Sequence, residues 1–157
     1  QIRYRWRKST SENGWVRLTQ KVYFLDPEGF SSDSLAEYNY TLSPVSGLRF
    51  ASETLVSEKN NEDGIGWVIS HSAAYYFRLS DRSAIQYQVG TYAYTRPAWA
   101  TQDYRLGIRY RRNFLRPWLF YEVEPFWEWP KAENFGTVTG ITLRLEVLFG
   151  FYNGNGL

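Results

Sequence analysis

The sequence lacks cysteine and methionine entirely and contains a single histidine, His71. Without cysteine there can be no disulfide, thiolate metal site or cysteine nucleophile, and one imidazole leaves at most one histidine for catalysis or metal binding. Long apolar runs are missing too, because the longest stretches free of Asp, Glu, Lys and Arg, 64–77 and 83–95, are shorter than the ~18 residues of a membrane-spanning helix. We therefore expect no metal, no cofactor and no helical membrane span.

An excess of one charge is also absent. The 18 basic and 16 acidic residues give a net charge of +2 and are interspersed, so no single-sign field favours nucleic acid as a partner. The chain is nevertheless 43% hydrophobic and 19% aromatic, which is enough apolar surface to offset chain entropy. With 157 residues and no shift in composition, we expect one folded domain over residues 1–157.

Hydrophobic residues recur with a period of two, the pattern of strands with two unlike faces. The alternation is clearest in residues 16–24, 103–111, 119–129 and 141–149. Weaker alternation occurs in residues 2–8, 35–42, 48–55, 67–79 and 84–94. The sequence therefore predicts about nine strands and no helix.

The predicted connections alternate in length. Short turn signals lie at 11–14, 43–47, 80–83 and 113–117, whereas 26–34, 58–66, 95–102 and 130–136 are longer and rich in Gly, Pro, Asn or Asp. The acidic stretch 58–64 lacks the spacing of an EF-hand, and we interpret it as a solvated loop. Neighbouring antiparallel strands in one sheet are the simplest arrangement.

In each predicted strand, every second residue is mostly apolar, and we call this set the apolar parity and the alternate set the polar parity. Alternation alone does not decide whether the apolar parity faces a protein core or lipid. Three features favour lipid: strands as long as the 9 to 11 residues of a membrane strand, alternating short and long connections, and aromatic residues near strand ends. These aromatic residues are Trp6, Trp15, Trp67, Trp118, Trp127, Trp129 and Tyr110.

A sheet in lipid must close, because lipid offers no partner for backbone N–H and C=O groups. We therefore predict an all-β fold, a transmembrane antiparallel up-and-down β-barrel of about 8–10 strands. Bacterial single-chain barrels have an even number of strands, whereas the sequence predicts nine. Either residues 48–55 or residues 2–8 do not form a strand, or a further strand precedes Gln1. We favour the last, since the chain starts without an initiator methionine.

The run Gly-Ile-Thr-Leu-Arg-Leu-Glu-Val-Leu-Phe at 140–149 resembles the closing strand of Gram-negative outer-membrane β-barrels. Together with residues 116–125, it is similar to the C-terminal part of uncharacterised proteobacterial outer-membrane proteins. The resemblance implies a bacterial outer-membrane location, contact with outer-membrane lipid, and recognition by the barrel-assembly machinery. The residues that would carry this assembly signal are Ile141, Leu143, Leu145, Val147 and Phe149. The chain departs from the pattern by continuing to Leu157, where many members end at the aromatic residue.

The polar parity of the strands carries both charges. We expect a network that fills the interior of the barrel, with the arginines of 103–111 paired to the glutamates of 119–129, because unpaired buried charges are costly. Its members would be Arg17, Lys21, Glu37, Glu53, Arg105, Arg109, Arg111, Glu122, Glu124, Glu128, Arg144 and Glu146. Further basic residues with this parity are Arg3, Arg5, Arg7 and Arg49. The alternative is a narrow polar pore whose charges select solutes.

His71 near serines raises the hypothesis of a lipid hydrolase. Ser70 and Ser72 have the opposite parity and Ala73 has no hydroxyl, so only a neighbouring strand could supply a nucleophile. We predict no catalytic residue and a non-enzymatic membrane anchor or partner-binding barrel, within a larger protein or complex. The alternatives are the pore, a lipid-modifying outer-membrane enzyme, and a soluble lipocalin-like barrel with a ligand among the aromatic residues.

Overall fold

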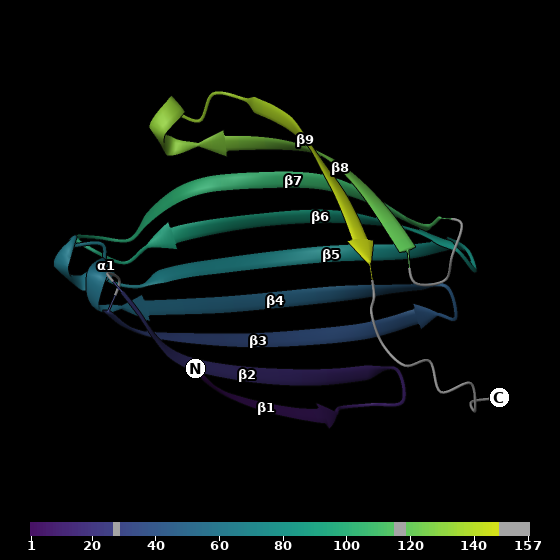
Figure 1. Ribbon diagram of the computed structural model, residues 1–157, viewed down its shortest axis with the longest axis horizontal. Helices are drawn as coiled ribbons and strands as arrows, with labels where there is room; N and C mark the ends of the chain where they lie inside the picture. Colours follow the sequence, from purple (N-terminus) through teal and green to yellow (C-terminus); the bar gives the residue numbers. More distant parts are fainter. Residues whose placement is uncertain (27–28, 115–118, 148–157) are drawn as a thin grey trace.

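A computed structural model of the chain describes residues 1–26, 29–114 and 119–147. It is an all-β protein in which nine strands form a single antiparallel sheet, and each strand pairs with the next one in sequence (Figure 1). The strands are β1 (Ile2–Ser9), β2 (Gly14–Leu25), β3 (Gly29–Ser43), β4 (Ser46–Ser57), β5 (Val68–Ser80), β6 (Ser83–Tyr94), β7 (Ala100–Asn113), β8 (Leu119–Pro130) and β9 (Val138–Val147).

The predicted up-and-down order of nine strands is confirmed. The two segments that the odd count put in doubt are both strands: 48–55 lies in β4 and 2–8 in β1. Ile2 lies opposite Val22 at one margin of the sheet and Leu119 opposite Val147 at the other. Between them the register shifts at three places, in the β3–β4, β5–β6 and β6–β7 pairs. The strand that we expected before Gln1 stays a prediction.

Two connections differ from the sequence prediction because they contain short helices. Helix α1 (Glu58–Glu62) begins after Ser57, whose hydroxyl accepts a hydrogen bond from the Asn60 backbone N–H at 3.0 Å, as N-cap serines commonly do. A 3₁₀ turn, η1 (Lys131–Glu133), follows β8. The expectation of no helix was therefore wrong at these two places. Neither helix has the length and apolar composition needed to cross a membrane.

The prediction of a long loop at 26–34 was also wrong, because β3 already begins at Gly29 and pairs there with Leu25. The first half of β3 has the composition of a loop, since it carries Ser31, Ser32 and Asp33. Its polar side chains nevertheless lie against β2, where Ser31 and Asp33 are buried. A strand that buries polar residues therefore resembles a loop when only its sequence is considered.

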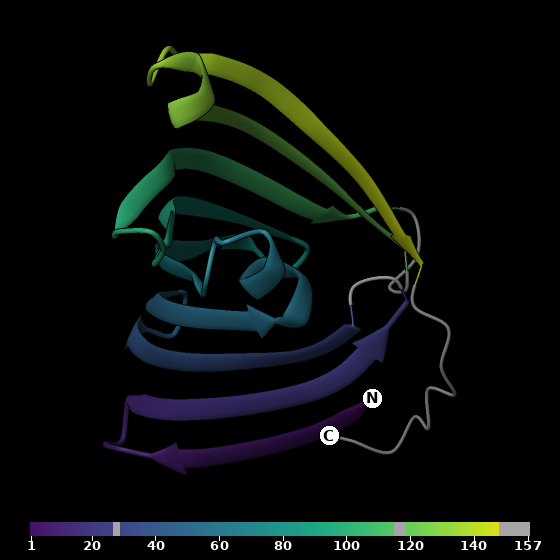
Figure 2. The same cartoon turned by 90° about the vertical axis from the view of Figure 1, so that its left-hand side faces the viewer.

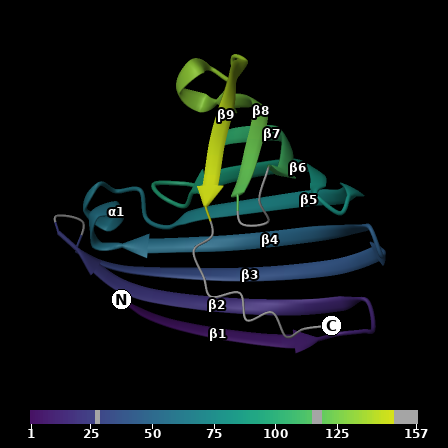
Figure 3. The same ribbon diagram turned by 45° about the vertical axis from the view of Figure 1, so that its right-hand side comes forward.

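The sheet is strongly curved, with β1 at one margin and β9 at the other (Figure 2). Over the described residues it does not close, because β1 and β9 each pair with only one neighbour. The closed barrel of the sequence prediction is therefore not present in this part of the chain. The same open arc, with β1 and β9 at opposite margins, is visible from a third direction (Figure 3).

Burial is reversed relative to an ordinary soluble domain. Among the described residues, the buried hydrophobic side chains are only Ala74 and Ala93, whereas buried polar or charged residues include Glu37, Glu122 and Glu124. Large apolar side chains are instead exposed, as at Leu143, which is 75% exposed. Soluble proteins rarely bury carboxylates and leave most large aliphatic side chains in contact with solvent.

Candidate functional site

The most organised feature of the sheet is the face that carries the charged parity of its strands, which we call the polar face. Because side chains alternate along a strand, the register places Arg17, Glu37, Ala51, Ser72 and Gly90 in one row across this face. The row continues to Arg105 and Glu128. In this row the charged residues therefore lie on the two flanks of the sheet and small uncharged residues lie in its middle, whereas neighbouring rows of β6 carry Gln86 and Gln88.

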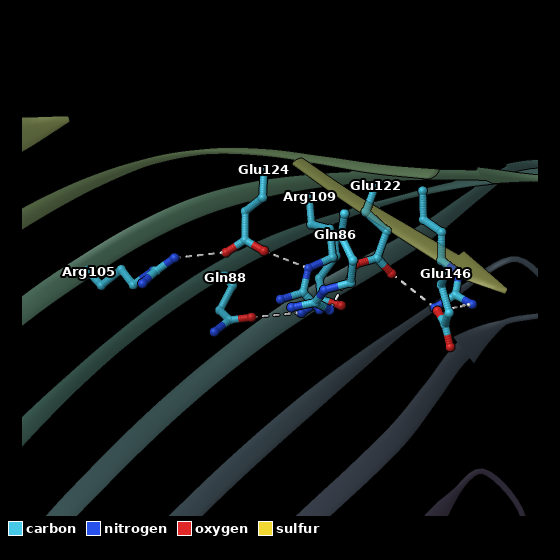
Figure 4. A network of polar contacts seen from close by, with 9 residues as sticks. Gln86, Gln88, Arg105, Arg109, Glu122, Glu124 and Glu146 are labelled. Carbon is cyan, nitrogen blue, oxygen red and sulfur yellow. Dashed lines mark hydrogen bonds and ion pairs between the residues drawn. The ribbon is translucent and has the colours of Figure 1, made fainter. Parts of the chain in front are cut away.

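One cluster of charges joins β7 to β8. Arg105 donates hydrogen bonds to Glu128 Oε1 at 2.7 Å and to Glu124 Oε1 at 3.1 Å. Arg109 Nε donates to the other oxygen of Glu124, Oε2, at 2.7 Å (Figure 4). Glu124 is only 8% exposed, and both of its oxygens accept charge-assisted bonds, which are stronger than neutral ones.

The cluster continues from β8 to β9 through Glu122. Arg111 donates to Glu122 Oε1 at 3.0 Å, and Arg144 donates to Glu122 Oε2 at 3.1 Å. Arg111 also lies 2.9 Å from Glu146 Oε2, so one arginine contacts carboxylates from two strands. Within this cluster four arginines face four glutamates, and the formal charges cancel.

A second cluster lies on the opposite flank, across β2, β3 and β4. Glu37 is 2% exposed and forms ion pairs with Arg17 from β2 and Arg49 from β4. Lys21 is paired with Asp33, and each lies four residues along its strand from Arg17 and Glu37, respectively. Asp33 was missing from the predicted network, although it continues the parity of Glu37 at i−4 and that spacing was available in the sequence.

Most of the predicted network residues thus lie in one of these two clusters, and Glu53 is the exception. It has the same parity on β4 and is half-buried, but it makes no ion pair within the described ranges 1–26, 29–114 and 119–147. Asp33 keeps a buried oxygen, Oδ1, without a hydrogen-bond partner on this flank. The flank around β2 to β4 is therefore less completely paired than the flank around β7 to β9.

Aromatic rings cover part of the cationic surface. The Arg105 guanidinium lies 4.4 Å from the centre of the Phe126 ring, and that of Arg111 lies 4.3 Å from the Phe120 ring. Both rings share the parity of the glutamates on β8. Such cation–π contacts hold a guanidinium flat while its edge remains available to carboxylates.

Two glycines make room for these side chains. A Cβ at Gly140 would lie 2.5 Å from the Phe126 ring, so the ring rests on β9 in space that any other residue would fill. A Cβ at Gly107 would lie 3.3 Å from Glu124 Oε1, between the two arginines that the carboxylate binds. The glycines therefore belong to the packing of the charged cluster and not to turns.

The arginines of β1 are different. Arg3, Arg5 and Arg7 lie opposite Lys21, Thr19 and Arg17, and they are exposed. None of the three takes part in an ion pair within the part of the chain that the structure describes.

His71 lies on the other face of the sheet, which we call the apolar face. Its register partners are Ser52 on β4 and Thr91 on β6, so hydroxyl groups do flank the imidazole. His71 is exposed, and it forms no side-chain hydrogen bond to either hydroxyl in the described structure. Two shallow hollows, of about 390 and 410 Å³, meet at His71 and Phe50. No group of three or more acidic or histidine side chains suited to a metal ion occurs among the described residues.

The predicted assembly signal lies on the apolar face of β9. Ile141, Leu143 and Leu145 are exposed, whereas Val147 is partly covered at the end of the strand. Phe149 lies outside the described residues, as does Trp118. Of the other predicted interfacial tryptophans, Trp6 and Trp67 are exposed, and Trp15, Trp127 and Trp129 are partly covered.

No protein family, curated protein or solved structure that was compared with this chain matches it, and its function is therefore inferred from its own residues.

Proposed function

We propose that the chain is the membrane-embedded barrel part of a bacterial outer-membrane protein, which serves as an anchor or partner-binding barrel and whose interior is filled by the charged clusters. In this arrangement the polar face points inward and the apolar face contacts lipid. The proposal accounts for both faces at once. A soluble barrel with a ligand among its aromatic residues would require the opposite orientation.

The apolar face supports lipid contact. Removing apolar surface from water contributes about 25 cal/mol per Å². A row of exposed side chains such as Ile141, Leu143 and Leu145 on one strand therefore favours an apolar environment. The central strands β2 to β8 have 12 to 15 residues, more than the 9 to 11 that a tilted strand needs to cross a bilayer.

The polar face supports a filled interior. Long arginine and glutamate side chains from adjacent strands contact one another above the polar face. Their charges cancel within the β7–β9 cluster. Isolated charges would be costly there, but paired and hydrogen-bonded charges are tolerated. In barrels of about eight strands, side chains nearly fill the lumen.

The observation that carries the proposal is the burial of Glu122 at 5% exposure next to Leu143 at 75% exposure in paired strands. The test is folding of the purified chain into phosphatidylcholine vesicles, followed by circular dichroism and by gel migration with and without heating. We expect β-structure only with vesicles or detergent, and a compact band that shifts on heating. A monodisperse, folded chain in plain buffer would contradict the proposal.

The middle of the polar face favours a polar pore as a second candidate. Ala51, Ser72 and Gly90 lie side by side on β4, β5 and β6, so this row has little side-chain volume between the charged flanks. Rings of charge beside a narrow passage select ions. Conductance across a planar bilayer distinguishes the two candidates: a filled barrel gives no current, whereas a pore gives discrete current steps. For a pore, we expect Gly90→Gln to reduce the size of these steps. The control Val89→Leu, on the apolar face, should leave them unchanged.

A further inference from the structure

The polar face ends at β1 with cations that have no acidic partner among residues 1–26, 29–114 and 119–147. Arg3 and Arg5 contact no carboxylate within the described residues, and Arg7 lies 4.1 Å from the Trp15 ring instead. One strand further in, Arg17 and Lys21 each meet a carboxylate on β3. On this flank of the sheet, the alternation of a cation on one strand with a carboxylate on the next therefore stops between β2 and β1.

The free backbone edge of β1 lies beside these arginines. β1 pairs with β2 alone, so the N–H and C=O groups along its other edge have no strand to bind. Unpaired edges in lipid are costly, since each unsatisfied backbone group costs several kcal/mol there. The edge therefore needs a strand, and the arginines restrict which strand it can be.

Direct closure between β1 and β9 does not complete the antiparallel pattern. Eight successive antiparallel pairings lie between these two strands, so they point in the same direction. An added strand that runs opposite to β1 is also antiparallel to β9. One added strand can therefore continue the hydrogen-bond pattern at both margins of the sheet.

A second copy of the chain is a poor occupant of this edge. Antiparallel pairing of two β1 strands would bring Arg3, Arg5 and Arg7 of one copy close to the same residues of the other. Like charges in facing positions of two strands destabilise the pair.

We propose that the edge of β1 binds an antiparallel partner strand with carboxylates at alternate positions, which face Arg3, Arg5 and Arg7. Its other parity is apolar and continues the surface formed by Ile2, Tyr4 and Trp6. The added strand supplies backbone hydrogen bonds along the edge and gives each arginine an acidic neighbour. The inference rests on the proposed function in two respects: the free edge of β1 lies in the membrane, and the apolar parity of the added strand faces lipid.

The test uses the 157-residue chain folded in detergent micelles and three fluorescein-labelled peptides that differ only at alternate positions. One peptide alternates Leu with Glu, the second Leu with Gln, and the third Leu with Lys. Fluorescence anisotropy gives the affinity of each. We expect the Glu peptide to bind at least about tenfold more tightly than the Gln peptide, because three opposite-charge cross-strand pairs add up.

Charge reversal identifies the binding edge. The variant Arg3→Glu/Arg5→Glu/Arg7→Glu should reverse the preference from the Glu peptide to the Lys peptide. The matched control, Arg82→Glu/Arg112→Glu, changes exposed arginines away from β1 and should keep the original preference. Equal binding of all three peptides, or an unchanged preference in the triple variant, would overturn the inference. A doubled mass by sedimentation without peptide binding would also overturn it, in favour of a second copy.

Cross-linking measures the direction of the added strand. Because the chain has no cysteine, single cysteines at Ile2 or Trp6 can be oxidised with cysteines near either end of the Glu peptide. An antiparallel strand joins Ile2→Cys to the C-terminal end of the peptide and Trp6→Cys to its N-terminal end. The reverse result contradicts the inference. Failure of the vesicle experiment with intact peptide binding would instead contradict only the proposed membrane function.

Discussion

Arg109 Nε lies 2.7 Å from Glu124 Oε2, and this contact ties β7 to β8 at a carboxylate that is almost fully buried. The same carboxylate also accepts a bond from Arg105, so its charge is shared between two guanidinium groups. Both arginines remain about one-third exposed, which weakens each pair through solvent screening. The glutamate is therefore the member of the group whose loss costs most.

We predict that Glu124→Gln destabilises the folded chain by about 1–2 kcal/mol, because it leaves Arg109 without a carboxylate in a partly buried position. Urea unfolding in detergent micelles, followed by tryptophan fluorescence, measures the change. Glu133→Gln in η1 is the control, since this exposed glutamate should change stability by less than about 0.5 kcal/mol. Equal effects of the two substitutions would show that the buried cluster contributes nothing.

The close contact between Gly140 and Phe126 gives a second prediction. Gly140→Ala places a methyl group against the ring, and we expect a loss of about 1–3 kcal/mol from overpacking. Phe126→Leu removes the obstructing ring, so the double variant should lose less than the sum of the two single variants. The same unfolding measurement applies, and strict additivity would mean that the two residues do not interact.

The loss of stability caused by a charged substitution on the apolar face should depend on how deep the substituted residue lies in the bilayer. We expect Leu143→Arg, in the middle of β9, to reduce the stability in vesicles by about 2–4 kcal/mol. Leu79→Arg lies at the end of β5 and should cost about 0–1 kcal/mol, although both leucines are exposed. Two equally small effects would argue against lipid contact of this face.

His71 separates the proposed anchor from a lipid-modifying enzyme. Because no hydrogen bond joins its imidazole to Ser52 or Thr91 in the described structure, we expect His71→Ala to keep the stability within about 0.5 kcal/mol. We also expect no difference between variant and parent in the release of fatty acid from labelled phospholipid vesicles. Release by the parent that disappears in the folded variant would favour the enzyme.

The sequence predicted the strands and their two faces well because both depend on the same short-range alternation. In β9, for example, Leu143 and Arg144 are adjacent in sequence and on opposite faces of the strand. The alternation does not determine the register, since a shift by two residues keeps every side chain on its face. Which arginine binds which glutamate therefore required the structure.

Two features of the site could not be predicted because they depend on contacts between strands. The ring of Phe126 over Gly140 requires the β8–β9 register, and the shared carboxylate of Glu37 requires strands on both sides. The buried start of β3 was missed for another reason, since Asp33 and its serine neighbours have a loop-like composition. Serine and aspartate are common in solvated loops, but on this face of the sheet Asp33 is buried and paired with Lys21 of the neighbouring strand.

The scarcity of buried hydrocarbon has a calorimetric consequence. Ordinary domains show a heat-capacity increment of about 12–15 cal/mol/K per residue on unfolding, mainly because apolar groups become hydrated. In this sheet the buried hydrophobic side chains among the described residues are those of two alanines, and much of what melting would newly hydrate is ionic. The heat-capacity change on unfolding should therefore be unusually small, and the unfolding enthalpy should vary little with temperature.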